Sequence, residues 1–227
     1  MPESIVPESA LESLPLLALR NSVLFPAAVV PVNVGRPRSV RLIEEAFGLD
    51  RPTIGVVAQR KSDEEDPSFE GLHEIGTLAR VLKVIRLSSG QYSVVLQGIA
   101  RMRLLEAVAR EPCLRARVQR IGDQTQRDPE IESLTLHLRG AARELLRTLP
   151  QPPREVAVVL DNVQEPGALC DLIAAHLPVT ADRKQQILET IDLRKRLKAV
   201  LEQLKRQSEI HRVKKEVADM VQQEMSK

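Results

Sequence analysis

The stretch GTLARVLKVIRLSSGQYSVVLQ, residues 76–97, contains the clearest hairpin signal in the sequence. Two strand-like segments, 76–87 and 91–97, flank Ser88-Ser89-Gly90. A three-residue connection that contains glycine is typical of a tight antiparallel turn. Apolar side chains fall on both faces of 82–87, so we expect both faces to be partly covered.

Further short apolar segments lie on either side of this hairpin. The segments that predict strands are 14–19, 29–34, 53–59, 99–108 and 114–121. Pro31 predicts that 29–34 is an edge strand, because proline lacks the N–H that an inner strand must donate. The segment 39–47 repeats apolar residues at threes and fours, which predicts one short helix. Since regularly spaced crossover helices are missing from this pattern, it favours a closed or strongly curved antiparallel barrel.

After Gly122 the apolar period changes to that of a helix. Helices are predicted over 129–149, with Asp128 as the N-cap, over 154–163, and from Pro166 to just before Pro178. A further helix is predicted to begin at Thr180 and Asp182. The fold class is therefore α+β: an antiparallel β pseudo-barrel with one short helix, then an α-helical bundle that ends in a long helix.

The last forty residues predict one long amphipathic helix. Its first apolar group is Leu197, Val200, Leu201 and Leu204, and its second is Ile210, Val213, Val217, Met220 and Val221. Unbroken from Asp192, it would be about 50 Å long at ~1.5 Å per residue, too long to pack fully on so small a body. It stops at residue 227 without a capping signal, so we expect 1–227 to be the front part of a larger protein. The predicted divisions are a β-rich domain over 1–122, a helical bundle over 123–190 and the long helix over 191–227.

Composition excludes several classes of function. Of the 227 residues, 43% are hydrophobic and 28% are charged, as in ordinary soluble globular proteins. Aromatic residues make up only 2%, so a stacking platform for single-stranded nucleic acid is not expected. The net charge of +2 gives no overall field toward a polyanion. There is no secretory signal pattern and no apolar run near the ~20 residues of a membrane span, so we expect a cytoplasmic protein without a membrane partner.

No catalytic or metal-binding motif is present in the sequence. It lacks a phosphate-binding G-x-x-x-x-G-K-[ST] loop, a G-x-G-x-x-G fingerprint, an H-E-x-x-H pair and a G-x-S-x-G elbow. The four histidines lie far apart in the chain, and Cys113 and Cys170 are expected to be buried small apolar residues. We therefore expect no catalytic, cofactor or metal residue in this chain.

The terminal helix carries two further candidate surfaces. Between residues 183 and 227 there are 12 Lys and Arg against 7 Asp and Glu. The basic side chains that fit a nucleic-acid stripe are Arg194, Lys195, Arg196, Lys198, Arg212, Lys214 and Lys215, although the solvated face of any amphipathic helix has the same composition. The apolar face from Ile210 to Val221 predicts self-association or contact with a downstream part of the same polypeptide.

At LPLLALRNSVLFP, residues 14–26, the sequence resembles the N-terminal substrate-recognition domain of the Lon family of ATP-dependent proteases. In that family an L-P-L-L-x-L-R-[DN] strand leads into a V-[VL]-F-P turn. The resemblance continues in order through VGRPRS (34–39), VVAQR (56–60), EIGTLAR (74–80) and QG (97–98), and reaches the helices at EPGALCDLIA (165–174), KQQILETIDLRKRL (184–197) and 209–225. One departure is Ala27, at a position where glycine usually follows F-P.

This resemblance implies a PUA-like pseudo-barrel followed by a helical bundle. It also implies a parent that is a homohexameric AAA+ machine with ATP, Mg²⁺ and a Ser-Lys protease dyad, none of whose residues lie in 1–227. This chain would recognise unfolded or degron-bearing protein substrates (clients) and aid assembly of the hexamer. The candidate contacts are Leu24, Phe25, Pro26 and Val29 in the first turn, together with Ile210, Val213, Val217, Met220 and Val221.

Two alternatives remain at this point. The first-turn residues fit an ordinary barrel core as well as a client contact. A stand-alone protein-interaction or DNA-binding module could use the same barrel, in which case duplex affinity would fall steeply with salt.

Overall fold

The structure is a computed structural model that describes residues 12–50, 52–122, 128–149 and 154–225. The chain divides into two compact units. One unit contains 1–122 and 180–189, and the other contains 123–179 and 190–227.

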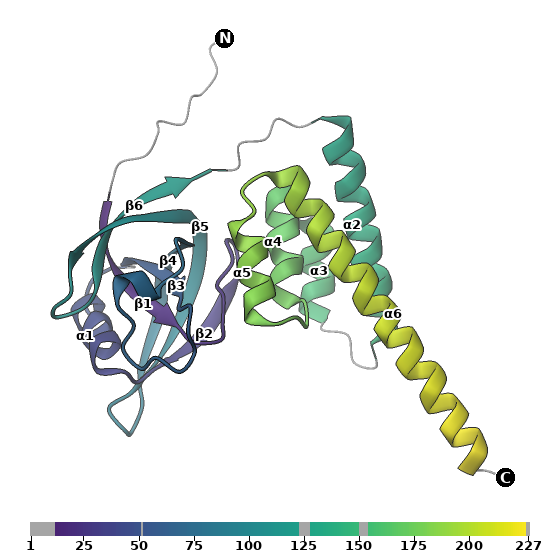
Figure 1. The fold of residues 1–227 in the computed structure, drawn as a ribbon, viewed down its shortest axis with the longest axis horizontal. Helices are drawn as coiled ribbons and strands as arrows, with labels where there is room; N and C mark the ends of the chain where they lie inside the picture. The colour runs from purple at the N-terminus through teal and green to yellow at the C-terminus, as the bar shows by residue number, and fades with distance from the viewer. Residues whose placement is uncertain (1–11, 51, 123–127, 150–153, 226–227) are drawn as a thin grey trace. The chain divides into compact units, whose positions relative to one another are not determined.

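The first unit is built on one six-stranded sheet (Figure 1). Its strands are β1 (Glu12–Leu19), β2 (Val29–Val34), β3 (Thr53–Ala58), β4 (Ile75–Arg86), β5 (Tyr92–Ala109) and β6 (Arg115–Ile121). The order is β2-β5-β4-β3-β1-β6, and β6 also pairs with β5. Because β5 pairs with β4 on one side and with β6 on the other, five strands close into a barrel, and β2 remains at an edge as Pro31 predicts.

One strand pair differs from the antiparallel expectation. β1 and β3 run parallel, with Leu16 opposite Gly55 and Leu19 opposite Ala58. Between them the chain passes through β2 and the helix α1 (Pro37–Ala46), which is long enough to bring it back in the same direction. The other strand pairs are antiparallel, so the α+β class is confirmed, with a mixed sheet.

The predicted hairpin at 88–90 joins β4 to β5. β5 is one strand of 18 residues, where the sequence pattern predicted two. Gly98 lies at the join because a side chain there would not fit: a Cβ atom would stand 2.1 Å from the carbonyl oxygen of Phe25. The close approach of two backbones therefore requires glycine within the strand.

The interior of the barrel is aliphatic, as the scarcity of aromatic residues predicts. Its central cluster comprises Leu16, Val57, Leu72, Leu78, Met102, Leu104, Leu114, Ala116 and Val118. Phe25 and Ile43 are also fully buried, which anchors the first turn and α1 to the same unit.

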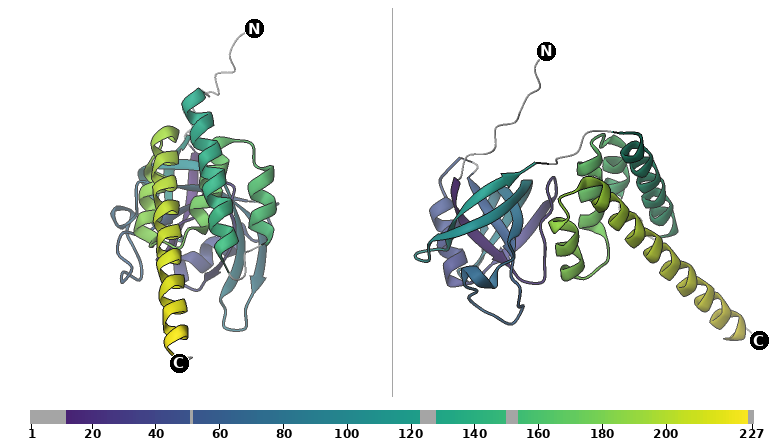
Figure 2. Two further views of the ribbon diagram at one scale, coloured as in Figure 1. Left: turned by 90° about the vertical axis from the view of Figure 1, so that its right-hand side faces the viewer. Right: turned by 45° about the horizontal axis from the view of Figure 1, so that its top comes forward.

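The second unit contains α2 (Pro129–Thr148), α3 (Arg154–Asn162), α4 (Pro166–His176) and α6 (Leu193–Met225), with α6 packed on α2 and α4 (Figure 2). The predicted cap is confirmed, since the Ile131 N–H donates to Asp128 Oδ1 at 2.9 Å. Inside this unit lies a buried ion pair, with Arg196 Nε 3.5 Å from Asp171 Oδ1.

The helix α5 (Ala181–Glu189) groups with the sheet, whereas the predicted division placed 180–189 in the helical bundle. Gln185 Nε2 donates to the carbonyl oxygen of Ile75 at 2.9 Å. Arg101 Nε donates to the carbonyl oxygen of Leu188 at 2.9 Å. These contacts join residues 110 and 87 positions apart in the chain, so local sequence pattern gives no sign of them.

Candidate functional site

The first turn, predicted as a client contact, belongs mostly to the core. Leu24 and Phe25 are 3% and 0% exposed, so neither is available to a client. The Thr77 hydroxyl donates to the Leu24 carbonyl at 2.6 Å and fixes this segment from inside. Pro26 is half-buried, and only Val29 is well exposed, at 54%. For Leu24 and Phe25 the barrel-core interpretation is therefore correct.

Besides Val29, three apolar side chains near the end of β4 that the sequence analysis did not single out are 37–43% exposed: Leu82, Ile85 and Leu87. We call Val29 and these three side chains together the hairpin face. Both faces of 82–87 were expected to be partly covered, and Val84 is half-buried, but the other apolar side chains stay more than a third exposed because β4 extends past the end of β3 here and pairs only with β5. The sequence feature that could have indicated this exposure is the presence of apolar residues on both faces of 82–87.

The long helix provides the second exposed apolar surface. In its first half Leu197, Val200 and Leu204 are buried against the bundle. Beyond them α6 continues past the end of α2, as Figures 1 and 2 show. The side chains that follow are 38–59% exposed, and we call them the distal stripe: Ile210, Val213, Val217, Met220 and Val221.

The basic residues at the start of α6 do not form a free cationic stripe. Arg196 is 0% exposed and its charge faces Asp171, so it cannot contact a nucleic acid. Arg194 pairs with Asp128, and Lys198 Nζ lies 2.8 Å from Glu130 Oε1.

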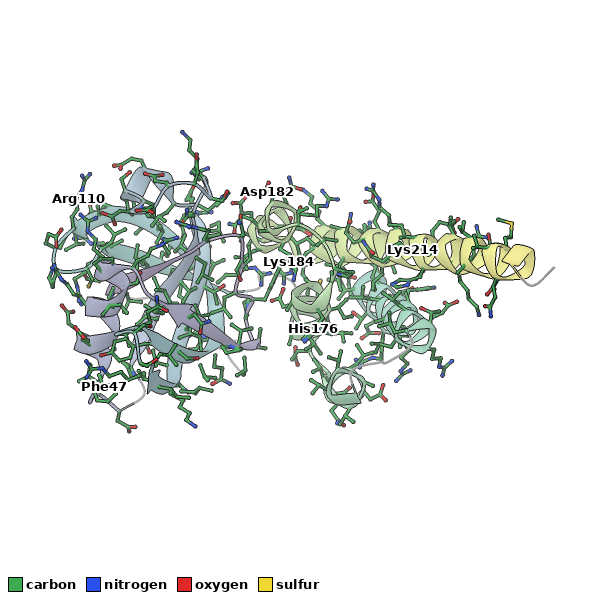
Figure 3. The ribbon with its side chains drawn as sticks, turned by 90° about the horizontal axis from the view of Figure 1, so that it is seen from below. Phe47, Arg110, His176, Asp182, Lys184 and Lys214 are labelled. Atoms are coloured by element: carbon green, nitrogen blue, oxygen red, sulfur yellow. The ribbon has the colours of Figure 1, made fainter. Side chains whose placement is uncertain are left out.

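Further along α6, Arg212 is also paired with carboxylates of the same helix. Its guanidinium lies 2.5 Å from Glu209 and 2.8 Å from Glu216, and these carboxylates raise its pKa. Lys195, Lys214 and Lys215 are exposed, and Figure 3 shows Lys214 on the extended part of α6. Lys195 and the neighbouring pair Lys214 and Lys215 are a much smaller cationic surface than the seven residues proposed from sequence.

The described residues offer little to catalytic chemistry. Among them no group of three or more His, Cys, Asp or Glu is arranged to hold a metal ion. Cys113 and Cys170 are buried, and burial followed by the nearby Glu45 carboxylate raises the pKa of the Cys113 thiol. A buried thiol with a raised pKa is a poor nucleophile. Within the same described part of the chain, no helix is long and apolar enough to cross a membrane.

Comparison with known proteins agrees with this architecture. Residues 13–206 match the family model of the ATP-dependent protease La (LON) substrate-binding domain. The N-terminal domain of Mycobacterium avium complex Lon protease superimposes with a TM-score of 0.67 at 20% identity, over 86% of this chain and 98% of that one. A Lon N-terminal domain protein from Xanthomonas campestris gives a TM-score of 0.56 at 22% identity, over 84% of this chain and 97% of that one. These likenesses support the fold.

Sequence relatives extend the match over the whole chain. Lon protease 2 of Sorangium cellulosum is 51% identical over 230 residues, covering 100% of this chain and 29% of the relative. Lon protease of Anaeromyxobacter dehalogenans is 42% identical, over 94% of this chain and 25% of the relative. This chain thus spans less than a third of the length of these relatives. It belongs to the family of the ATP-dependent protease La (LON) substrate-binding domain.

Proposed function

We propose that this chain recognises clients for an ATP-dependent protease by holding apolar segments that unfolding exposes. The observation that carries the proposal is the placement of two exposed apolar surfaces, the hairpin face and the distal stripe, within a chain of this family. Isolated exposed apolar residues are common on monomers, but a run along one helix is typical of an interaction surface.

The chemistry of these surfaces suits a receptor for many sequences. Both carry exposed apolar side chains, which contact any apolar segment without a specific pocket. Each contact is weak alone. In the whole protein, which we propose to be a cytoplasmic hexamer with ATPase and Ser-Lys protease domains, repeated display would raise the effective concentration of the receptor.

The distal stripe has a second proposed role in assembly. The apolar residues past Leu204 lie beyond the bundle, so their burial requires another chain or another part of the polypeptide. We propose that self-association through this stripe accompanies client binding, because both use the same aliphatic chemistry.

Client binding is tested with one protein in two states. The probe is fluorescently labelled α-lactalbumin, either native or reduced and carboxymethylated so that it stays unfolded. Fluorescence anisotropy with the 227-residue chain should show binding of the unfolded form only, with little change between low and high salt. Equal binding of both forms would contradict the proposal. Affinity for duplex DNA that falls steeply with salt would favour the nucleic-acid alternative.

A further inference from the structure

We propose that the free edge of β4 at residues 82–86 accepts an extended client segment as an additional β-strand. This inference rests on the proposed function and specifies how a client is held there. Side chains of the hairpin face would supply apolar contact, while the backbone of β4 would supply hydrogen bonds that do not depend on client sequence.

The hydrogen-bond pattern of the hairpin shows which backbone groups are available. The Leu87 N–H donates to the Gln91 carbonyl at 2.8 Å. Because facing and outward residues alternate in an antiparallel ladder, Ile85 faces Ser93, whereas the N–H and C=O of Val84 and Arg86 point away from β5.

These outward groups have no strand partner among the described residues. β3 ends its pairing at Thr53 opposite Arg80, and the Val81 N–H reaches the Pro52 carbonyl at 3.0 Å. Beyond Val81, β4 pairs only with β5, and five of the six residues 82–87 are exposed. An unpaired row of backbone donors and acceptors is a template for another strand.

Here β2, β5 and β4 lie side by side, and the opposite edge of this section cannot pair with an added strand in the same way. β2 forms that edge, and Pro31 lies opposite Val95. Since the backbone of Val95 faces β4, the nitrogen of Pro31 points to the free edge of β2, where it has no hydrogen to donate. β4 has no proline between 75 and 86, so every residue at the β4 edge keeps its backbone N–H donor.

Charge favours a client over a second copy of this chain. Segments 29–34 and 80–97 contain Arg80, Lys83 and Arg86 but no Asp or Glu. Two such edges pairing with each other would bring like charges together, which disfavours self-pairing. A client strand that alternates apolar and acidic residues would instead place carboxylates on the face of Arg86 and apolar side chains on the opposite face, beside Ile85.

The test uses backbone methylation, which removes N–H donors without removing side chains. The probe is a fluorescein-labelled nine-residue peptide of alternating Val and Glu, prepared unmodified, N-methylated at every Val, or N-methylated at every Glu. Strand addition predicts that one methylated peptide binds the 227-residue chain at least about tenfold more weakly, because it loses the N–H donors that would bond to the outward carbonyls of Val84 and Arg86. The other should bind within about threefold of the unmodified peptide, because its N–H groups that face β4 are intact.

A pair of variants provides an independent measurement. Arg86→Pro removes an edge N–H and should weaken the unmodified peptide about tenfold, whereas Arg86→Gln keeps that N–H and should cost about threefold or less. Circular dichroism checks that both variants are folded; if Arg86→Pro is not, the two methylated peptides still decide.

The outcomes separate the two proposals. Equal binding of both methylated peptides, or binding of unfolded α-lactalbumin without binding of the unmodified peptide, overturns strand addition and leaves client recognition standing. If neither the peptide nor unfolded α-lactalbumin binds, the proposed function itself fails.

Discussion

Removal of one charge from the buried Arg196–Asp171 pair should strongly destabilise the helical unit. Arg196 is 0% exposed and Asp171 2%. Arg196 Nε lies 3.5 Å from Asp171 Oδ1, and Nη1 donates to the carbonyls of Thr190 at 3.1 Å and Ile191 at 3.3 Å. One guanidinium therefore holds α4 and the start of α6 together.

The substitution Arg196→Met leaves the carboxylate of Asp171 buried without its cation. Breaking a buried ion pair from one side costs about 3–5 kcal/mol, because the remaining charge is desolvated and uncompensated. The double substitution Arg196→Met with Asp171→Leu removes both charges and fills similar volume. Since such replacements are often close to neutral, the double variant should recover most of the loss.

Urea denaturation followed by circular dichroism at 222 nm measures this cost, because helices dominate that signal. The expected result is a free energy of unfolding about 3–5 kcal/mol lower for Arg196→Met and largely restored in the double variant. A loss below about 1 kcal/mol for the single variant would refute a buried, coupled pair. An equal loss in both variants would show that packing, not charge, is what the substitution removes.

Three other substitutions test local features of the structure. Ala27 has a φ of 63°, a left-handed conformation that costs a residue other than glycine about 1–2 kcal/mol. Ala27→Gly removes this strain but adds conformational entropy to the unfolded chain, so the free energy of unfolding should rise by about 0.5–1 kcal/mol. A free energy of unfolding below that of wild type in urea denaturation would contradict the strained turn. Gly98→Ala should cost about 3 kcal/mol or more, because its Cβ would meet the Phe25 carbonyl 2.1 Å away, and a melting temperature equal to wild type would exclude that clash. Asp128 has its pKa lowered, first by the Ile131 N–H, so its stabilising effect is complete above an ordinary aspartate pKa of about 3.9 and is lost as pH falls through the lower folded value. Asp128→Asn keeps the cap but cannot titrate, so its melting temperature should fall less than that of wild type below about pH 4, and parallel pH profiles would argue against the effect.

The features that sequence predicted are those set by nearby residues. The turn at 88–90, the edge position of β2 and the cap at Asp128 each depend on a residue type whose backbone chemistry leaves few alternatives. The pattern of short strands before Gly122 and the helical period after it predicted a barrel followed by helices, the arrangement that the family resemblance also implies and that the comparisons support.

The features that sequence missed depend on long-range pairing. Nothing local distinguishes a parallel from an antiparallel partner for β1, and Gln185 meets Ile75 only after the chain has passed through three helices. The basic cluster at 194–198 illustrates the same limit. Nothing in the sequence distinguishes the buried Arg196 from the basic residues beside it. The difference comes from Asp171, which lies next to Arg196 in the folded structure.

Hydrogen–deuterium exchange of the 227-residue chain, with and without carboxymethylated α-lactalbumin, tests most directly whether clients contact the two exposed apolar surfaces. The account predicts that bound client slows exchange in 82–87 and in 210–221, while the amides of α2 exchange as before. Slower exchange confined to other segments, with both of these unchanged, would contradict it.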